Sequence, residues 1–158
     1  MTDQPSTGLV CPITGCPIKK ILITTIIVMI ATYAYDFLFH GVLMRADYEA
    51  TANLWRSEAD MKALFPFCLI YHGVLAFAVS GLYCMYAKGC ACGGKCPKTG
   101  MKFGLFIGLI VGIGMFSSYI WLPMPLAMAV KWLVGGVVWG LLIGFVLSKV
   151  ASCCCKKA

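Results

Sequence analysis

Four ionisable side chains interrupt otherwise apolar stretches of this chain: Asp36, His40, His72 and Lys131. Asp36 and His40 are four residues apart, which places them on one face of a helix and within reach of a mutual hydrogen bond. Two histidines with a carboxylate suit a divalent metal, two histidines on neighbouring helices suit a haem, and an acid, a histidine and a lysine suit proton relay. The alternative is a structural polar cluster, with Lys131 extending to the membrane interface.

Cysteine is the second reactive residue type, with ten copies in 158 residues. Cys68 and Cys84 lie inside an apolar stretch and are interpreted as ordinary buried small residues. The others lie outside such stretches: Cys11, Cys16, Cys90, Cys92, Cys96, Cys153, Cys154 and Cys155. Thiols gathered at one membrane face bind soft metals such as copper or zinc, although their spacings match no zinc or iron–sulfur motif. The alternative is a set of uncommitted or lipid-modified thiols.

Composition and hydropathy define the elements that position these residues. With 61% hydrophobic and 12% charged residues, the chain has too little polar surface for a soluble domain. Runs of about 20 apolar residues cross a bilayer as helices, and four such runs are present: 21–44, 64–87, 103–122 and 126–147. We therefore predict an all-α polytopic membrane protein with one domain, residues 1–158, whose four transmembrane helices form two antiparallel hairpins.

Lysine residues are distributed unevenly along the connecting segments. They cluster next to the N-terminal segment (1–18), in the loop 88–102 and in the tail 149–158, whereas the first loop balances three basic residues against four acidic ones. The positive-inside rule therefore predicts that both termini and the second loop are cytoplasmic. Thiols on that side stay reduced, so no disulfide framework is expected.

The four ionisable residues lie at similar depths in these spans. With about 1.5 Å of rise per residue, Asp36 and His72 are roughly 5 Å outward of their span centres, and His40 and Lys131 roughly 8 to 11 Å outward. Because charged groups are costly in hydrocarbon, we expect all four to point inward, toward one another or toward water.

Glycine recurs every fourth residue in the last two spans, at Gly104, Gly108 and Gly112 and at Gly136, Gly140 and Gly144. Each set makes a smooth stripe on one helix face, which lets another backbone approach closely. Only three residues separate these spans, so they must form a hairpin, and the stripes either face each other or turn outward toward a second protein.

The first loop has a composition that favours helix, and we predict a short extracytoplasmic helix between the first two spans. Tyr48 and Trp55 suit the membrane interface. Ser57 followed by Asp60 resembles a capping box that opens the second span, and Pro66 should kink that span near its outer end.

The segments YDFLFHGVLM (35–44) and YEATANLWRSEADM (48–61) resemble small four-span membrane proteins of bacteria. The resemblance covers the first hairpin. It implies a four-span protein of the bacterial inner membrane and assigns neither an activity nor site residues.

Two classes of function remain after the motif search. No phosphate-binding loop, catalytic triad, metalloprotease motif or dinucleotide fingerprint is present, which argues against an enzyme. The net charge is +7. The lysines that give this charge flank the helix ends, where they meet lipid headgroups, so no nucleic-acid partner is expected. The favoured hypothesis is an accessory subunit that packs against itself or a larger membrane complex through its glycine stripes. The alternative is a soft-metal binding or transport protein, with a haem-binding or proton-relay subunit as further variants.

Overall fold

The computed structural model describes residues 9–90 and 94–150, and these residues fold almost entirely into helices. Four helical segments are long and apolar enough to cross a membrane: Ile18–Leu43, Phe65–Lys88, Pro97–Trp121 and Leu126–Val150. The predicted all-α architecture with four spans is confirmed, and the chain is an integral membrane protein in contact with the lipid bilayer.

The helical elements follow one another as α1 (Ile18–Asp36), the π-helical turn η1 (Phe37–Leu43), α2 (Arg45–Ala50), the 3-10 turn η2 (Ala52–Leu54), α3 (Glu58–Ala63), α4 (Phe65–Lys88), α5 (Pro97–Phe116), α6 (Ser118–Trp121) and α7 (Leu126–Val150). The third span begins six residues before the predicted start at 103. Proline is well suited to the first turn of a helix, where its missing N–H is not needed, and Pro97 occupies that position.

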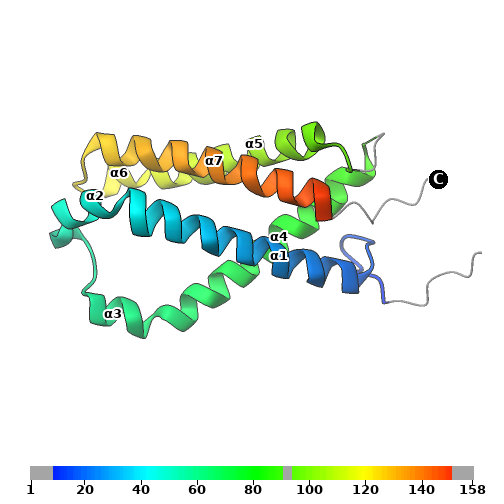
Figure 1. Cartoon of the computed structure of the whole chain (residues 1–158), viewed down its shortest axis with the longest axis horizontal. Coiled ribbons are helices and arrows are strands. Elements are labelled where there is room, and N and C mark those ends of the chain that lie inside the picture. The colour runs from blue at the N-terminus through cyan, green and yellow to red at the C-terminus, as the bar shows by residue number, and fades with distance from the viewer. Residues whose placement is uncertain (1–8, 91–93, 151–158) are drawn as a thin grey trace, which may run out of the picture.

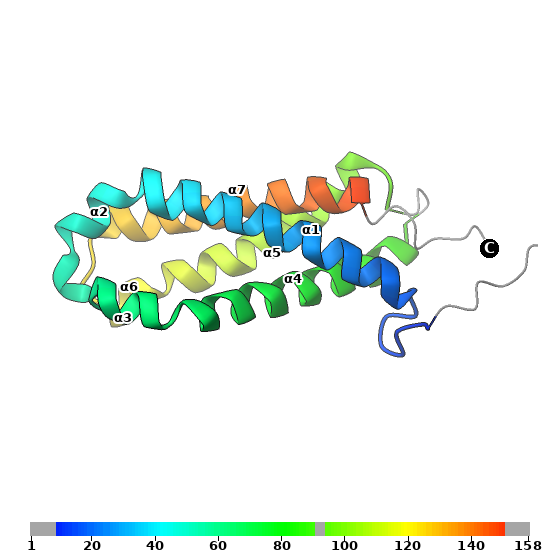
Figure 2. The ribbon, with the colours of Figure 1, turned by 60° about the horizontal axis from the view of Figure 1, so that its bottom comes forward.

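Figures 1 and 2 show the two hairpins side by side, with the described ends of the chain at one end of the bundle. Helices α5 and α7 run alongside each other over their full length, and α1 lies next to α7. Helix α4 packs on α1 but diverges from the α5–α7 pair toward the α3 end (Figure 1). The hydrophobic core lies where all four spans meet, around Val28, Tyr83, Phe103, Trp139 and Leu147.

The glycine stripes of α5 and α7 face each other. A Cβ atom on Gly104 would overlap the backbone oxygen of Gly140. A Cβ atom on Gly108 would lie 2.6 Å from the backbone oxygen of Gly136. Gly100 extends the stripe by one turn, against Gly144. Backbone-to-backbone packing of this kind supplies dispersion contacts that lipid would not. Both stripes are therefore used within the chain, and neither is turned outward toward a second protein.

The first loop contains two short α-helices, α2 and α3, where one was predicted, and Ser57 caps α3. Its hydroxyl accepts a hydrogen bond from the Asp60 N–H at 3.1 Å and donates to the Asp60 carboxylate at 2.7 Å. The capped helix is α3, which ends at Ala63, so the second span is a separate helix. Pro66 lies in the first turn of α4 and not within a continuous kinked helix, because its missing N–H is tolerated at a helix start.

Candidate functional site

Asp36 and His72 meet between α1 and α4. Nε2 of His72 lies 2.7 Å from Oδ2 of Asp36, and Nδ1 lies 2.7 Å from the backbone oxygen of Cys68, one turn earlier on α4. A carbonyl oxygen only accepts hydrogen bonds, so Nδ1 carries a proton and donates it. The contact between Nε2 and the carboxyl group then holds one further proton, which resides on the imidazole or on Asp36.

This Asp36–His72 bridge has no net charge in either form, since the two groups are both charged or both neutral. Neutrality lowers the free energy of placing the pair in a membrane. The His72 side chain is 7% exposed and that of Asp36 is 34% exposed, so Asp36 is the accessible end of the bridge. Asp36 is also the only acidic residue within the four spans, all of whose residues the structure describes.

His40 lies one turn beyond Asp36 and bonds to the first loop. Its Nδ1 lies 2.6 Å from the hydroxyl of Tyr48, which accepts a hydrogen bond from Trp132 Nε1–H at 3.1 Å. Burial raises the pKa of Tyr48, so the hydroxyl keeps its proton, and the tautomer of His40 decides which of the two groups donates in this contact. Asp36 and His40 make no hydrogen bond to each other in the described structure, because each is held by a partner from another element.

The turn that carries His40 is held against α7. A hydrogen bond from Met44 N–H to the oxygen of Phe39, five residues earlier, marks the wide π-helical turn of η1. The Phe39 ring occupies the space that a Cβ atom on Gly135 would need. Tyr35 stacks on Phe39 and donates a 2.7 Å hydrogen bond to the oxygen of Gly135. Turns of this type are rare and frequently occur at functional sites.

Lys131 extends away from the Asp36–His72 bridge. Its Nζ lies 2.8 and 2.7 Å from the two carboxylate oxygens of Asp47 in α2, and its side chain is 51% exposed. This position agrees with extension to the membrane interface and leaves Lys131 outside any relay through His72. The four ionisable residues thus form one intramembrane bridge and two separate contacts with the first loop.

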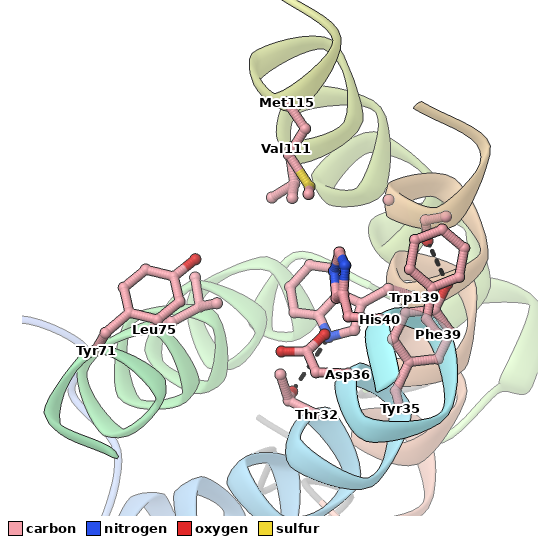
Figure 3. Close-up of a pocket in the computed structure, with 12 residues that line it drawn as sticks. Thr32, Tyr35, Asp36, Phe39, His40, Tyr71, Leu75, Val111, Met115 and Trp139 are labelled. Carbon is pink, nitrogen blue, oxygen red and sulfur yellow. Dashed lines mark hydrogen bonds between the residues drawn. The ribbon is translucent and has the colours of Figure 1, made fainter. Parts of the chain in front are cut away.

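A cavity of about 210 Å³ lies beside the bridge, lined by residues of α1, η1, α4, α5 and α7. Figure 3 shows the Asp36 and His40 side chains directed into this space, with Tyr71 of α4 on one side and Val111 of α5 on another. Aromatic rings, including that of Trp139, form much of its wall. The cavity therefore presents one carboxyl group, one imidazole and several aromatic faces.

The sequence predicts Asp36, His40, His72 and Lys131 as site residues but does not identify the partners of His40 and Lys131. These partners are Tyr48, which is predicted to lie at the membrane interface, and Asp47, one of the four acidic residues of the first loop. Both lie in α2, and the contacts that they make with α7 span 84 residues of sequence. Such pairs depend on how the hairpins dock, and a single sequence carries no signal for them.

The expectation of reduced thiols was wrong for two cysteines, because Cys16 and Cys84 form a disulfide. The chain before α1 turns back at Gly15, which has a left-handed φ of 61°, and lies over the last turns of α4. Cys16 is consequently opposite Cys84, a residue interpreted as ordinary core. The expectation came from the presumed compartment, which says nothing about which thiols are adjacent.

The cysteine set proposed for metal binding is only partly within the described residues. Cys92, Cys153, Cys154 and Cys155 lie outside them. Cys11, Cys90 and Cys96 are free thiols, whereas Cys16 is oxidised and offers no thiolate. Across 9–90 and 94–150, no group of three or more histidine, cysteine or acidic side chains is placed to hold a metal ion.

A haem between the histidines does not fit the hydrogen bonding of His72. Both of its ring nitrogens are engaged, one with Cys68 and one with Asp36, so axial ligation would break one of these contacts. His40 bonds to a different element. The site is therefore better suited to exchanging a proton than to ligating iron.

Comparison of the chain with protein-family models, curated proteins and solved structures gave no match.

Proposed function

We propose that this membrane protein binds a small organic cation inside its helix bundle in exchange for one proton. The observation that carries the proposal is the cavity beside the Asp36–His72 bridge, into which Asp36 presents the sole carboxyl group of the four spans. A cation that pairs with Asp36 makes the bridge proton unnecessary, since the charge of the carboxylate is then balanced by the ligand. His72 stays neutral and keeps its hydrogen bond to Cys68.

The size and wall of the cavity define the ligand class. A cavity of roughly 150 Å³ holds benzene, so about 210 Å³ accommodates an aromatic ring with a small cationic substituent. Tyr71, Phe39 and Trp139 line the cavity, and aromatic rings attract a cation that lies over their faces. An inorganic metal ion is a poorer fit, because only one carboxylate and one free imidazole edge are available.

Binding of phenyltrimethylammonium to the protein in lipid nanodiscs tests this proposal. The neutral isostere tert-butylbenzene has the same shape without the charge. We expect the cation to bind at least tenfold more tightly, and Asp36→Asn to abolish this preference. Asp47→Asn is the matched control, since Asp47 pairs with Lys131 outside the cavity, and should bind like the unmodified protein. Equal binding of both probes, or binding of neither, contradicts the proposal.

An accessory subunit, as predicted from sequence, is the second candidate. The glycine stripes do not support it, because they are buried against each other. One other observation favours it: an apolar groove of about 510 Å³ between α1 and α4, lined by Ile30, Phe37, Phe65 and neighbouring residues. Side chains from a transmembrane helix of a second copy would fill such a groove. Ile30→Trp would fill it and should lower the dimer fraction measured by light scattering in mild detergent. A protein that is monomeric before substitution contradicts this candidate.

For orientation, we propose that the lysine-rich end of the bundle faces the cytoplasm of a bacterium. The distribution of lysines supports this proposal. Fusion of a reporter that is active only in the cytoplasm to the C-terminus tests it, and an inactive fusion in a correctly inserted protein contradicts it.

A further inference from the structure

The disulfide between Cys16 and Cys84 is enclosed by protein, with a third cysteine against it. Cys16 is 0% exposed and Cys84 is 2% exposed, so a dissolved reductant cannot approach the bond directly. Cys11 is a free thiol that packs on the cluster of Cys16, Ile21 and Cys84. The thiol with access to this disulfide is therefore one from the same chain.

The loop 11–16 places Cys11 next to Cys16. The Cys11 N–H donates to the oxygen of Cys16 at 2.9 Å, and the Gly15 N–H donates to the oxygen of Cys11 at 2.7 Å. An antiparallel bridge between Val10 and Pro17 closes the same loop. Residues opposed across such a pair are close enough for their side chains to form a disulfide.

Polar groups around the loop 11–16 favour exchange of the Cys16–Cys84 disulfide for a Cys11–Cys16 disulfide. Hydrogen bonds from Thr14, by its side chain first and then its backbone, lower the pKa of the Cys11 thiol, which raises the fraction of attacking thiolate. Lys88 lies one turn after Cys84 on α4, and its Nζ is 2.5 Å from the oxygen of Thr14. A positive charge there stabilises a thiolate that leaves on Cys84.

We propose that Cys11, Cys16 and Cys84 form a thiol–disulfide exchange site that fastens and releases the N-terminal segment from α4. The Cys11 thiolate attacks Sγ of Cys16, the bond between Cys11 and Cys16 forms, and the bond between Cys16 and Cys84 breaks. The electron pair leaves on Sγ of Cys84, which takes up the proton that Cys11 lost. The number of disulfides is unchanged, so no oxidant or reductant is needed.

This exchange removes the covalent link between the segment before α1 and the end of α4. Weaker contacts remain, such as the hydrogen bond from Lys88 and the packing of Thr14 near Gly81. It also replaces the buried Cys16–Cys84 disulfide by one within the loop 11–16, which exposes the Cys84 thiol on α4. A disulfide that shifts in this way suits a reducing compartment, where such bonds are usually transient.

Peptide mapping distinguishes the two linkages. The experiment uses the full chain in nanodiscs with the seven other cysteines replaced by serine, alkylated with N-ethylmaleimide and digested with trypsin. Cys11 and Cys16 fall on the peptide ending at Lys19, and Cys84 falls on the peptide 63–88. A Cys16–Cys84 bond yields joined peptides with Cys11 labelled, whereas a Cys11–Cys16 bond yields separate peptides with Cys84 labelled.

When Cys11 is present, we expect both the joined peptides and the separate peptides. Labelling of Cys84 should become faster as the pH rises. Cys11→Ser should give only the joined peptides. Thr14→Val removes the side-chain hydrogen bond to Cys11 and should slow Cys84 labelling severalfold at neutral pH. Absence of Cys84 labelling while Cys11 is present overturns the proposal, and so does labelling of all three thiols without added reductant.

Discussion

The two hairpins of this bundle are built in different ways. Helices α5 and α7 meet backbone to backbone along facing rows of glycines. Helices α1 and α4 meet through side chains, including the Asp36–His72 bridge, and α4 diverges from α5 beside a cavity. The second hairpin is thus closely packed along its own length, and the first hairpin carries Asp36 and His72, between which the proposed proton exchange takes place.

The largest expected effect is the loss of close packing between α5 and α7. Gly140→Val places side-chain atoms against the backbone of Gly104 and Gly108, and should destabilise the protein by about 3 kcal/mol. Gly114→Val on α5 is the control, because a Cβ atom there meets nothing within 4 Å, and should change stability by less than about 0.5 kcal/mol. Unfolding in sodium dodecyl sulfate, followed by tryptophan fluorescence, measures both values. Equal effects would contradict the assigned packing.

The next effect comes from the Asp36–His72 bridge. Asp36→Asn removes the carboxyl group that compensates a buried imidazole, and should cost about 1–3 kcal/mol, less than for a fully buried pair because Asp36 is partly exposed. Asp47→Asn breaks the more exposed pair with Lys131 and should cost less than about 1 kcal/mol. The same unfolding assay ranks the two. The reverse order would mean that the loop contact, and not the bridge, joins the helices.

A smaller effect is expected from the link between the hairpins. Tyr48→Phe removes the hydroxyl that joins His40 to Trp132, and should destabilise the protein by about 1 kcal/mol. Tyr119→Phe serves as the control, since no hydrogen bond to its hydroxyl is found among the described residues, and its stability should be unchanged. If the two variants unfold alike, the network does not connect the hairpins.

The smallest effect concerns an exposed pair in the loop. Lys62 lowers the pKa of Glu58, first through a hydrogen bond and then through its charge. The pair therefore stabilises α3 above the ordinary pKa of glutamate, and this stabilisation is lost as the pH falls through the lowered value. Glu58→Gln should reduce the helix content of the loop slightly at pH 7 and not at pH 3. Measurement by circular dichroism in low and high salt tests this, because salt should weaken the effect at pH 7. A difference that persists at pH 3 would contradict it.

The spans were predictable because each depends on a local property, a run of apolar residues of bilayer length. The glycine stripes were predictable for the same reason, and the short connection forced α5 and α7 together. The first hairpin was harder. Its site depends on the rotation of α1 relative to α4, on a π-helical turn and on a loop that folds back over α7, as in the contact between Tyr48 and Trp132. The Cys16–Cys84 disulfide likewise depends on a turn at Gly15.

The most direct test of the account is the number of protons released when phenyltrimethylammonium saturates the protein in a weakly buffered solution. We expect one proton per bound cation, an apparent affinity that rises about tenfold per pH unit while the bridge is protonated, and no proton release from Asp36→Asn. Binding of the cation without proton release from the unmodified protein would contradict it.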